Sequence, residues 1–391
     1  MPIWFFIFTF IILALTMLEI SRLIPQLLRE LKQISVFSLP QEPNSENAEV
    51  KVSVIIPAKD EAINILEAAE SILASTYRNL ELILVDDRSQ DDTWELMTRL
   101  RERDSRVKTI RLESLPEDWT GKTHAMFAGA EMASGNILLF TDADASLSKD
   151  LIGRSVQYFV TNKLDMLSLI PGFKKWGFLE RTVYPHMALG ISYFFPMRAI
   201  NDPHSDAAVA SGCFIMITTG AYQRVGTWRN LRNQITEDIA MARAVKSSGM
   251  RLSVSRSDLI KTKPFDNIFE MVRFWRRTFY GGLENRPGKI MRFWLNYTPL
   301  LLPFGLVLFL GARMAICGEF EPSVVILFIM SLATILTIEI PFGIFLKHYH
   351  GKWYYTLLSP LGIFACFWIA TWLLLTKIFD IGIEWRGSVY K

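Results

Sequence analysis

The chain has 391 residues, half of them hydrophobic, and a mean hydropathy of +0.23. It is too apolar and too long for one ordinary soluble domain, so membrane-spanning segments are expected. The net charge of +3 gives no argument for nucleic acid. The three cysteines are far apart and lack CxxC spacing, which argues against a disulfide framework or a zinc site.

The chain starts with an uncharged apolar run over residues 2–18. This run is near the short end of the roughly 20 residues that cross a membrane as a helix. No basic residue precedes it and no small-residue cleavage site follows, so we expect an uncleaved anchor over residues 1–21 rather than a signal peptide. Polar, proline-containing sequence then predicts a linker over residues 22–50.

Residues 51–292 form a more polar region in which strand and helix patterns alternate. Short apolar, largely β-branched runs predict strands over residues 50–58, 80–87, 107–113 and 136–144. Alternating strands and helices indicate βαβ units around a mostly parallel sheet, and hence a single α/β domain. The intervening helices are predicted over residues 62–75, 91–104 and 123–135.

Two aspartate pairs, Asp86 with Asp87 and Asp142 with Asp144, follow two of these predicted strands. The carboxyl ends of parallel strands meet at one edge of a sheet, which is where such sheets bind ligands. Two nearby carboxylates repel each other, and a divalent cation offsets that cost because it takes oxygen ligands. The structural alternative for each pair is a turn or a helix N-cap.

The sequence has no G-x-G-x-x-G motif and no G-x-x-x-x-G-K-[ST] motif, so neither a dinucleotide cradle nor a P-loop is predicted. Residues 121–123 read Gly-Lys-Thr but lack the upstream glycine at the required spacing. A phosphate ligand would therefore depend on a metal at Asp142 and Asp144, assisted by cations from elsewhere in the chain.

Residues 293–379 predict a transmembrane bundle, followed by a tail over residues 380–391. The apolar stretches of the bundle cover residues 294–317, 322–346 and 353–376, each with at most one charge. Basic residues follow the first apolar run and precede the second, which places both ends of the polar region in the cytoplasm. Four full spans would put the two termini on the same, non-cytoplasmic side.

The segments VSVIIPAKDEAIN, LILVDDRSQDDT, GKTHA, TDADA, SGCFIMI and ITEDIAMA stand in the order and spacing of the family 2 glycosyltransferases with a GT-A domain. The resemblance covers residues 52–282. The membrane layout is similar to that of ceramide glucosyltransferases and of hopanoid-associated and carotenoid glycosyltransferases. It implies an α/β nucleotide-diphospho-sugar transferase fold with one N-terminal and about three C-terminal transmembrane helices.

The resemblance also implies a donor site. Asp142 and Asp144 would bind Mg²⁺ or Mn²⁺ against the diphosphate of a nucleotide-sugar, a UDP-sugar before a GDP-sugar. A metal at that position stabilises the charge of the departing diphosphate. The residues that would contact the nucleotide are Pro57, Lys59, Glu61, Asp86, Asp87, Lys122 and Asp142.

By the same resemblance, Glu237 and Asp238 would carry the general base, with Asp238 favoured, and Arg276 and Arg277 would bind the leaving diphosphate. One base without a separate nucleophile predicts a single displacement that inverts the anomeric centre. The structural alternatives are a capped helix start at residues 236–238 and a basic helix at the membrane surface for the two arginines.

Two departures from the family pattern bear on the acceptor. Arg277 stands where processive synthases carry a tryptophan that stacks near the acceptor sugar, which favours a lipid alcohol over a sugar polymer. The C-terminal EWRGSVY is similar to a W-[RK]-G-R-x-Y ending of lipid-acting members, but Ser388 replaces its basic residue.

The sequence therefore predicts a metal-dependent, multi-pass membrane glycosyltransferase whose catalytic domain faces the cytoplasm. We expect a carotenoid or other isoprenoid alcohol as acceptor. Sphingolipid and glycerolipid alcohols are less favoured alternatives. A processive polysaccharide synthase and an inactive nucleotide-binding scaffold are the alternatives. The aromatic segment over residues 176–196 fits either a protein core or an interfacial element that guides a lipid.

Overall fold

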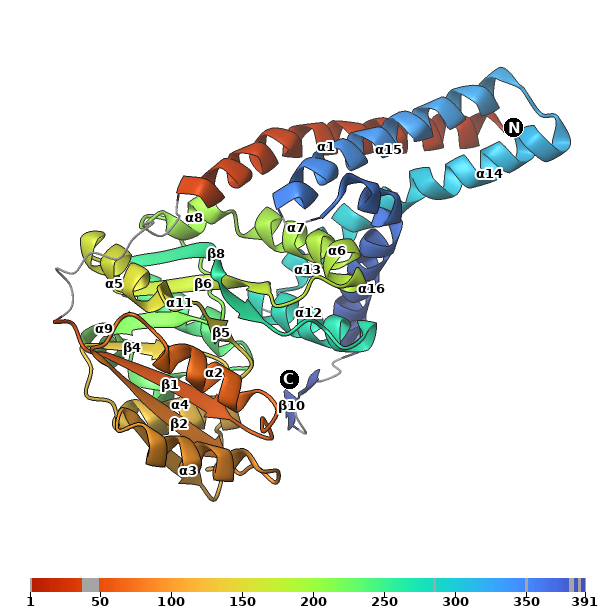
Figure 1. The fold of residues 1–391 in the computed structure, drawn as a ribbon. Coiled ribbons are helices and arrows are strands. Elements are labelled where there is room, and N and C mark those ends of the chain that lie inside the picture. Colours follow the sequence, from red (N-terminus) through yellow and green to blue (C-terminus); the bar gives the residue numbers. More distant parts are fainter. Residues whose placement is uncertain are drawn as a thin grey trace. The chain divides into compact units, whose positions relative to one another are not determined.

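The structure is a computed structural model, shown in Figure 1. It describes residues 2–36, 49–283, 286–348, 351–379, 383–385 and 388–390. The chain divides into two compact units. The sheet unit comprises residues 33–175 and 195–264, and the helical unit comprises residues 1–32, 176–194 and 265–391.

The sheet unit is built on an eight-stranded sheet with the order β3-β2-β1-β4-β7-β6-β8-β5. Strands β1 to β4 pair in parallel, and antiparallel β7 joins them to the parallel pair of β6 and β8. This arrangement confirms the predicted mostly parallel sheet. The strands are β1 Val52–Ala58, β2 Leu80–Asp87, β3 Val107–Leu112, β4 Ile137–Phe140, β5 Ser146–Leu147, β6 Met166–Phe173, β7 Ile215–Thr218 and β8 Leu252–Thr262.

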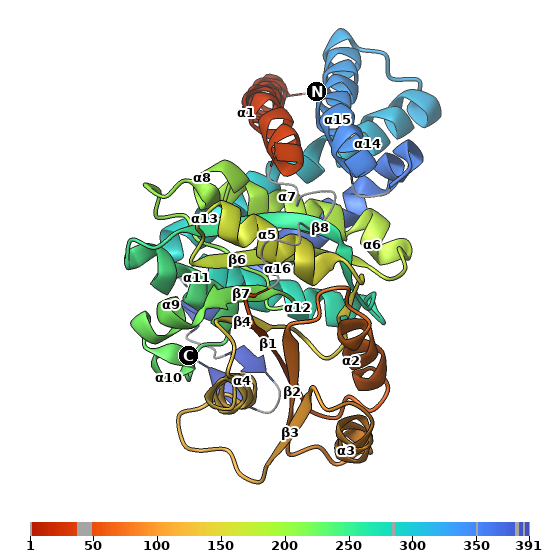
Figure 2. The same ribbon diagram turned by 60° about the vertical axis from the view of Figure 1, so that its left-hand side comes forward.

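Helices cover both faces of this sheet, as Figure 2 shows for α2 and α3 on one side and α4 on the other. The helices of the unit are α2 Ile65–Leu73, α3 Thr93–Arg103, α4 Gly121–Glu131, α5 Leu151–Thr161, α8 Met197–Asn201, α9 Thr219–Arg224, α10 Thr227–Asn230 and α11 Glu237–Ser247. The first three start within three residues of their predicted starts.

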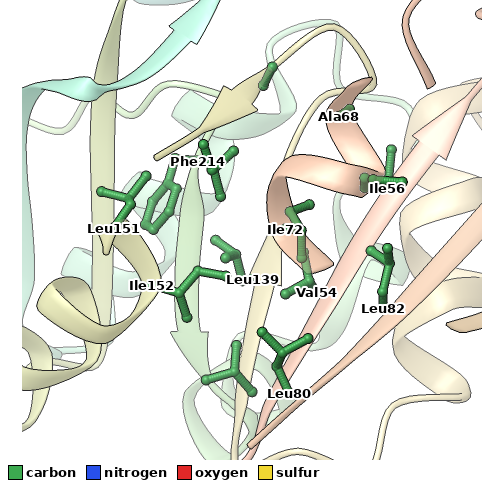
Figure 3. Packing of buried hydrophobic residues seen from close by; sticks show 14 of the residues in the cluster. Val54, Ile56, Ala68, Ile72, Leu80, Leu82, Leu139, Leu151, Ile152 and Phe214 are labelled. Atoms are coloured by element: carbon green, nitrogen blue, oxygen red, sulfur yellow. The ribbon is translucent and has the colours of Figure 1, made fainter. Parts of the chain in front are cut away.

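The alternation of side chains along β1 explains why the strand is buried on both faces. Val54 and Ile56 point into a core with Ile72 of α2, shown in Figure 3. Ile55 points the other way, where its side chain meets Gly129 of α4. The absence of a side chain at Gly129 lets α4 approach the sheet closely, which sets the position of the helix start near the strand ends.

The helical unit contains the apolar helices. Its elements are the α-helices α1 Ile3–Val36, α6 Phe178–Thr182, α7 Tyr184–Phe194, α12 Ile268–Gly282, α13 Pro287–Tyr297, α14 Leu302–Cys317, α15 Pro322–His348 and α16 Ser359–Ile378, the 3-10 helices Pro299–Leu301 and Trp353–Leu358, and the strands β9 Ile383–Trp385 and β10 Ser388–Tyr390. Helix α1 continues into the sheet unit after residue 32.

The described residues include four helical stretches long and apolar enough to cross a membrane, as predicted. They are Ile3–Ser21, Pro287–Cys317, Pro322–Lys347 and Trp353–Ile378. The first ends at the predicted anchor boundary, although α1 itself runs on to Val36. The cytoplasmic orientation remains a prediction from the basic residues.

The aromatic segment over residues 176–196 folds mainly into α6 and α7 of the helical unit. Val183 and Met187 are buried there with Phe279, Phe293 and Ile369. The core interpretation therefore holds for these side chains. The proposed lipid-guiding role of the segment remains a prediction.

The tail forms a short antiparallel pair, in which Ser388 lies opposite Trp385 and Tyr390 opposite Ile383. Residues 386 and 387, which carry the Arg-Gly of the tail motif, lie outside the described residues. A contribution of this tail to the active site thus remains a prediction.

Candidate active site

Acidic side chains gather at the carboxyl edge of the sheet, where β1, β2 and β4 end. The register places Ala58 opposite Asp86 and Ile55 opposite Phe140. Because these strands are parallel and adjacent, the loops that follow them leave the sheet at the same edge. The expected edge position of the two aspartate pairs follows from this pairing.

Asp86 and Asp87 differ in their partners. Asp86 is fully buried, accepts a hydrogen bond from Ser89 N (3.1 Å) and lies 3.2 Å from Arg111 Nε. The turn interpretation therefore describes Asp86 well. Asp87 is paired with Arg88 (2.8 Å) and lies directly against Gly121, at the start of α4. Asp87 thus links the end of β2 to the helix that carries Lys122.

The loop after β1, which contains Pro57, Lys59 and Glu61, is tied to the loop after β2. Glu61 N donates to Thr93 Oγ1 (2.9 Å), and the Glu61 carboxylate accepts from Asn64 (2.8 Å). Pro57 lies at the end of β1, and Lys59 follows it at the start of this loop. These contacts hold the predicted nucleotide-binding residues of both loops at one edge.

Lys122 connects acids that are far apart in the sequence. Its Nζ lies 2.7 Å from Asp142 Oδ1 and 2.8 Å from Glu237 Oε1. The Thr120 hydroxyl caps α4 by accepting from Thr123 N, which fixes the helix start from which Lys122 projects. Burial opposes its charged form, but the charges of Asp142 and Glu237 raise the pKa of Lys122 well above its ordinary value. Lys122 is therefore a cation at neutral pH.

Asp238 is oriented by the backbone. Gly212 N donates to Asp238 Oδ2 (2.9 Å), and Ile239 N donates to Asp238 Oδ1 (2.8 Å). A side chain at Gly212 would begin 3.0 Å from Lys122 Nζ and 3.5 Å from Asp238 Oδ2. Glycine therefore allows the acids at the start of α11 to approach Lys122. The helix-start interpretation of residues 236–238 is also correct in that α11 begins at Glu237, but the Thr236 side chain makes no capping hydrogen bond.

Asp144 is the acid with the least favourable surroundings. Burial and the charge of Asp142 raise its pKa to about 6, although Thr262 Oγ1 donates to its Oδ2 at 3.0 Å. Burial and the charges of these two aspartates also raise the pKa of the Cys213 thiol. The Cys213 thiol donates to Asp142 Oδ2 at 3.3 Å.

The donor set fits a hard divalent cation. Asp142 and Asp144 offer carboxylate oxygens, and the raised pKa of Asp144 comes from burial first and from the charge of Asp142 second, both of which a bound cation would offset. Within the described residues, no group of three or more His, Cys, Asp and Glu side chains could hold a metal.

Arg276 and Arg277 lie on α12 of the helical unit, whereas the acids belong to the sheet unit. The Arg276 guanidinium stacks 3.3 Å from the ring centre of Trp372. Arg277 lies 5.9 Å from the ring centre of Phe274. The placement of these arginines at a diphosphate remains a prediction.

The structure adds residues that the motifs did not single out. A cavity of about 370 Å³ lies at the ends of β2 and β3 and is lined by Arg88, Ser89, Arg111, Leu112 and Glu113. Arg88 directly follows the Asp86-Asp87 pair, and Arg111 is the basic residue at the end of the next strand. These two positions in the sequence could have indicated that both arginines lie near the site. A second cavity of about 430 Å³ is lined by Pro116, Trp119, His124, Phe127, Arg229 and Arg232.

Comparison with known proteins finds similarity over part of the chain. Residues 53–226 match the family model Glycosyl transferase family 2. One relative is the UDP-Glc:alpha-D-GlcNAc-diphosphoundecaprenol beta-1,3-glucosyltransferase WfaP of Escherichia coli, 31% identical over 113 residues, or 29% of this chain and 43% of the relative. Another is a 4,4'-diaponeurosporenoate glycosyltransferase of Staphylococcus haemolyticus, 33% identical over 99 residues, or 25% of each chain. Both alignments span less than half of the relative.

A solved structure extends the similarity to the fold. The mannosyltransferase PcManGT of Pyrobaculum calidifontis, in complex with GDP-Man and Mn²⁺, superposes with a TM-score of 0.52 at 17% identity. The superposition covers 94% of this chain and 99% of that chain. Together with the matched motifs, this similarity confirms the predicted fold. Residues 53–226 are therefore similar to the family 2 glycosyltransferases, and the chain has the GT-A fold.

Proposed function

We propose that this chain is a membrane-bound, inverting glycosyltransferase that moves a single sugar from a nucleotide-diphosphate donor to a lipid alcohol. The observation that carries the proposal is the convergence of Asp142, Lys122, Glu237 and Asp238 at one edge of the sheet. Asp142 on the donor side and Glu237, the neighbour of the candidate base Asp238, thus share the Lys122 ammonium group.

On the donor side, Asp142 and Asp144 would hold Mg²⁺ or Mn²⁺. When bound, the cation supplies stabilisation of the negative charge that develops on the leaving diphosphate. Arg88 and Arg111 line the cavity beside the ends of β2 and β3, and the buried Asp86 pairs with Arg111; charged hydrogen-bonding groups there suit a nucleotide base and ribose. Lys122 adds positive charge on the side of the diphosphate.

On the acceptor side, Asp238 would remove the proton of the acceptor hydroxyl. The backbone N–H groups of Gly212 and Ile239 orient its carboxylate as a hydrogen-bond acceptor. A positioned base of this kind contributes about 10²- to 10⁴-fold to the rate. With no second nucleophile assigned, the hydroxyl oxygen attacks the anomeric carbon directly as the bond to the diphosphate breaks, and the configuration inverts.

The acceptor proposal draws on the apolar helices and on the relatives. Four candidate spans support a membrane location, where a lipid alcohol would be available laterally. One relative is named for alpha-D-GlcNAc-diphosphoundecaprenol and another for 4,4'-diaponeurosporenoate. We therefore favour an isoprenoid or carotenoid acceptor, and a UDP-sugar as donor, for this chain.

The test compares Asp238→Asn with Asp92→Asn in the full chain, reconstituted with a total lipid extract. Asp92 is exposed at the start of α3, where asparagine is an equally good N-cap, so it is a matched control. We expect Asp238→Asn to lower nucleotide release and lipid-linked sugar by about 10²- to 10⁴-fold. Equal turnover in the two variants would reject the assigned base.

Mass spectrometry of lipids from cells with and without the gene identifies the acceptor. A lipid that gains one hexose-type unit supports the proposal, and its anomeric configuration tests inversion. A product with many sugar units would support the processive alternative. Nucleotide binding without any sugar-bearing product would support the scaffold alternative.

A further inference from the structure

Lys122 occupies a position that a simple phosphate-binding residue would not need. Its ammonium group lies 2.7 Å from a carboxylate oxygen of Asp142 and 2.8 Å from one of Glu237. The Asp142 carboxylate belongs to the donor side of the site, and Glu237 is the neighbour of the assigned base. The same cation therefore neutralises acids on both sides of the reaction.

The surroundings hold this ammonium group between the two acids. Glu237 is buried, and the backbone of Gly212 lies beside Lys122 Nζ. The lysine stem emerges from the capped first turn of α4, which limits its freedom. An ammonium group held in this way is worth more to its partners than one on an exposed side chain, because water screens it less.

We propose that Lys122 is an internal counter-cation that competes with the divalent metal for Asp142, so that the metal binds tightly only together with the nucleotide diphosphate. This inference rests on the proposed use of Asp142 as a metal ligand. Glu237 is the second anchor that keeps the ammonium group in the site when Asp142 turns to another cation.

The charges determine whether Lys122 weakens or strengthens metal binding. Without nucleotide, a cation at Asp142 meets a positive charge a few ångströms away and loses affinity. With nucleotide, the diphosphate brings negative charge that both the metal and Lys122 attract. The lysine thus opposes the metal alone and supports the metal with diphosphate, so removing it must change the two binding constants in opposite directions.

The experiment measures Mn²⁺ binding by electron paramagnetic resonance on the full chain in detergent, with and without UDP. The variants are Lys122→Gln, Lys122→Arg and the control Lys149→Gln, which alters an exposed lysine on the loop between β5 and α5. We expect Lys122→Gln to bind Mn²⁺ alone roughly tenfold more tightly, and UDP with saturating Mn²⁺ roughly tenfold more weakly. Lys122→Arg and Lys149→Gln should match the wild type in Mn²⁺ affinity.

Linkage gives a second readout. In the wild type, UDP should increase the affinity for Mn²⁺ by a larger factor than in Lys122→Gln, and Mn²⁺ should increase the affinity for UDP by the same factor. Unchanged or weaker binding of Mn²⁺ alone to Lys122→Gln would overturn the inference. Thermal unfolding of each variant shows whether it is folded, and Lys122→Met replaces Lys122→Gln if the latter is not.

These outcomes are separate from the test of the proposed function. Mn²⁺ affinity is measured without turnover, so an inactive Asp238→Asn leaves the competition measurable. An Asp142→Asn variant that binds Mn²⁺ and UDP like the wild type would remove the metal role of Asp142, and with it this inference. Loss of glycosyl transfer in that variant with unchanged Mn²⁺ binding would point to the same conclusion.

Discussion

The two edges of the central sheet each hold a buried or partly buried carboxylate, and the pKa values of these two carboxylates are shifted in opposite directions. At the amino edge, Glu81 of β2 accepts hydrogen bonds from Ser53 (2.6 Å) and Ser134 (2.7 Å) and pairs with Lys108 (2.8 Å). Burial opposes its ionisation, but these partners lower the pKa of Glu81 to about 2. This carboxylate is charged and fully satisfied by the protein.

At the carboxyl edge, Asp144 has the reverse balance. Burial and the nearby charge of Asp142 raise its pKa to about 6, and the hydrogen bond from Thr262 only partly compensates. The hydrogen bonds that the protein gives Asp144 do not fully stabilise its charged form. Perturbed carboxylates of this kind cluster at functional sites, because a ligand or substrate provides the missing interactions. The comparison separates an acid that stabilises the fold from one that we propose binds a ligand.

The largest expected effect on turnover comes from a substitution at the carboxyl edge. Asp144→Asn removes a charge that would hold the cation, so turnover should fall on the order of 10²- to 10³-fold. Because the substitution also removes repulsion with Asp142, the thermal unfolding midpoint should stay equal or rise. A lower midpoint together with normal turnover would assign Asp144 to the fold rather than to the site.

A substitution at the amino edge should lower stability and leave turnover unchanged. Glu81→Ala leaves Lys108, Ser53 and Ser134 without their shared acceptor, and we expect it to lower the free energy of unfolding by about 3 kcal/mol. Turnover per folded molecule should remain that of the wild type. Chemical denaturation followed by tryptophan fluorescence measures the first quantity, and a turnover assay on the soluble fraction measures the second.

The pH dependence of stability sharpens the same contrast. The pKa of Glu81 lies near 2 in the folded chain and near its ordinary value of 4.5 when unfolded, so the folded state loses this stabilisation as the pH falls from about 4.5 to about 2. Above pH 4.5 the contribution is complete. Unfolding midpoints of the wild type and Glu81→Gln should therefore converge over that range, and a constant difference would contradict the assignment.

The smallest expected effect concerns the backbone beside Lys122. Gly212→Ala would place a methyl group 3.0 Å from Lys122 Nζ, and a displaced ammonium group should lower turnover about tenfold. Gly220→Ala is the matched control, since a methyl group there meets nothing within 4 Å. Equal turnover in the two variants would show that the position of Lys122 tolerates this shift.

Local patterns in the sequence were sufficient for much of the architecture. Apolar β-branched runs predicted β1, β2 and β4 because these strands are buried, whereas β3 is only partly buried. The ends of β2 and β4 placed Asp86, Asp87 and Asp142 at one edge. Uncharged stretches of spanning length predicted the apolar helices, because the bilayer demands that length and composition from any single segment. Strands and apolar helices of this kind are determined by residues that are close together in the sequence.

Only the tertiary structure decided which of those residues meet. Lys122, Asp142 and Glu237 come from three separate loops and helix starts, and no local period encodes their contact. The structural role of Glu81 likewise depends on Ser134, from the segment after α4. Local periodicity records burial and secondary structure, whereas the pairing of charges depends on how the sheet brings distant segments together, so the sequence determined the candidates and the fold determined their partners.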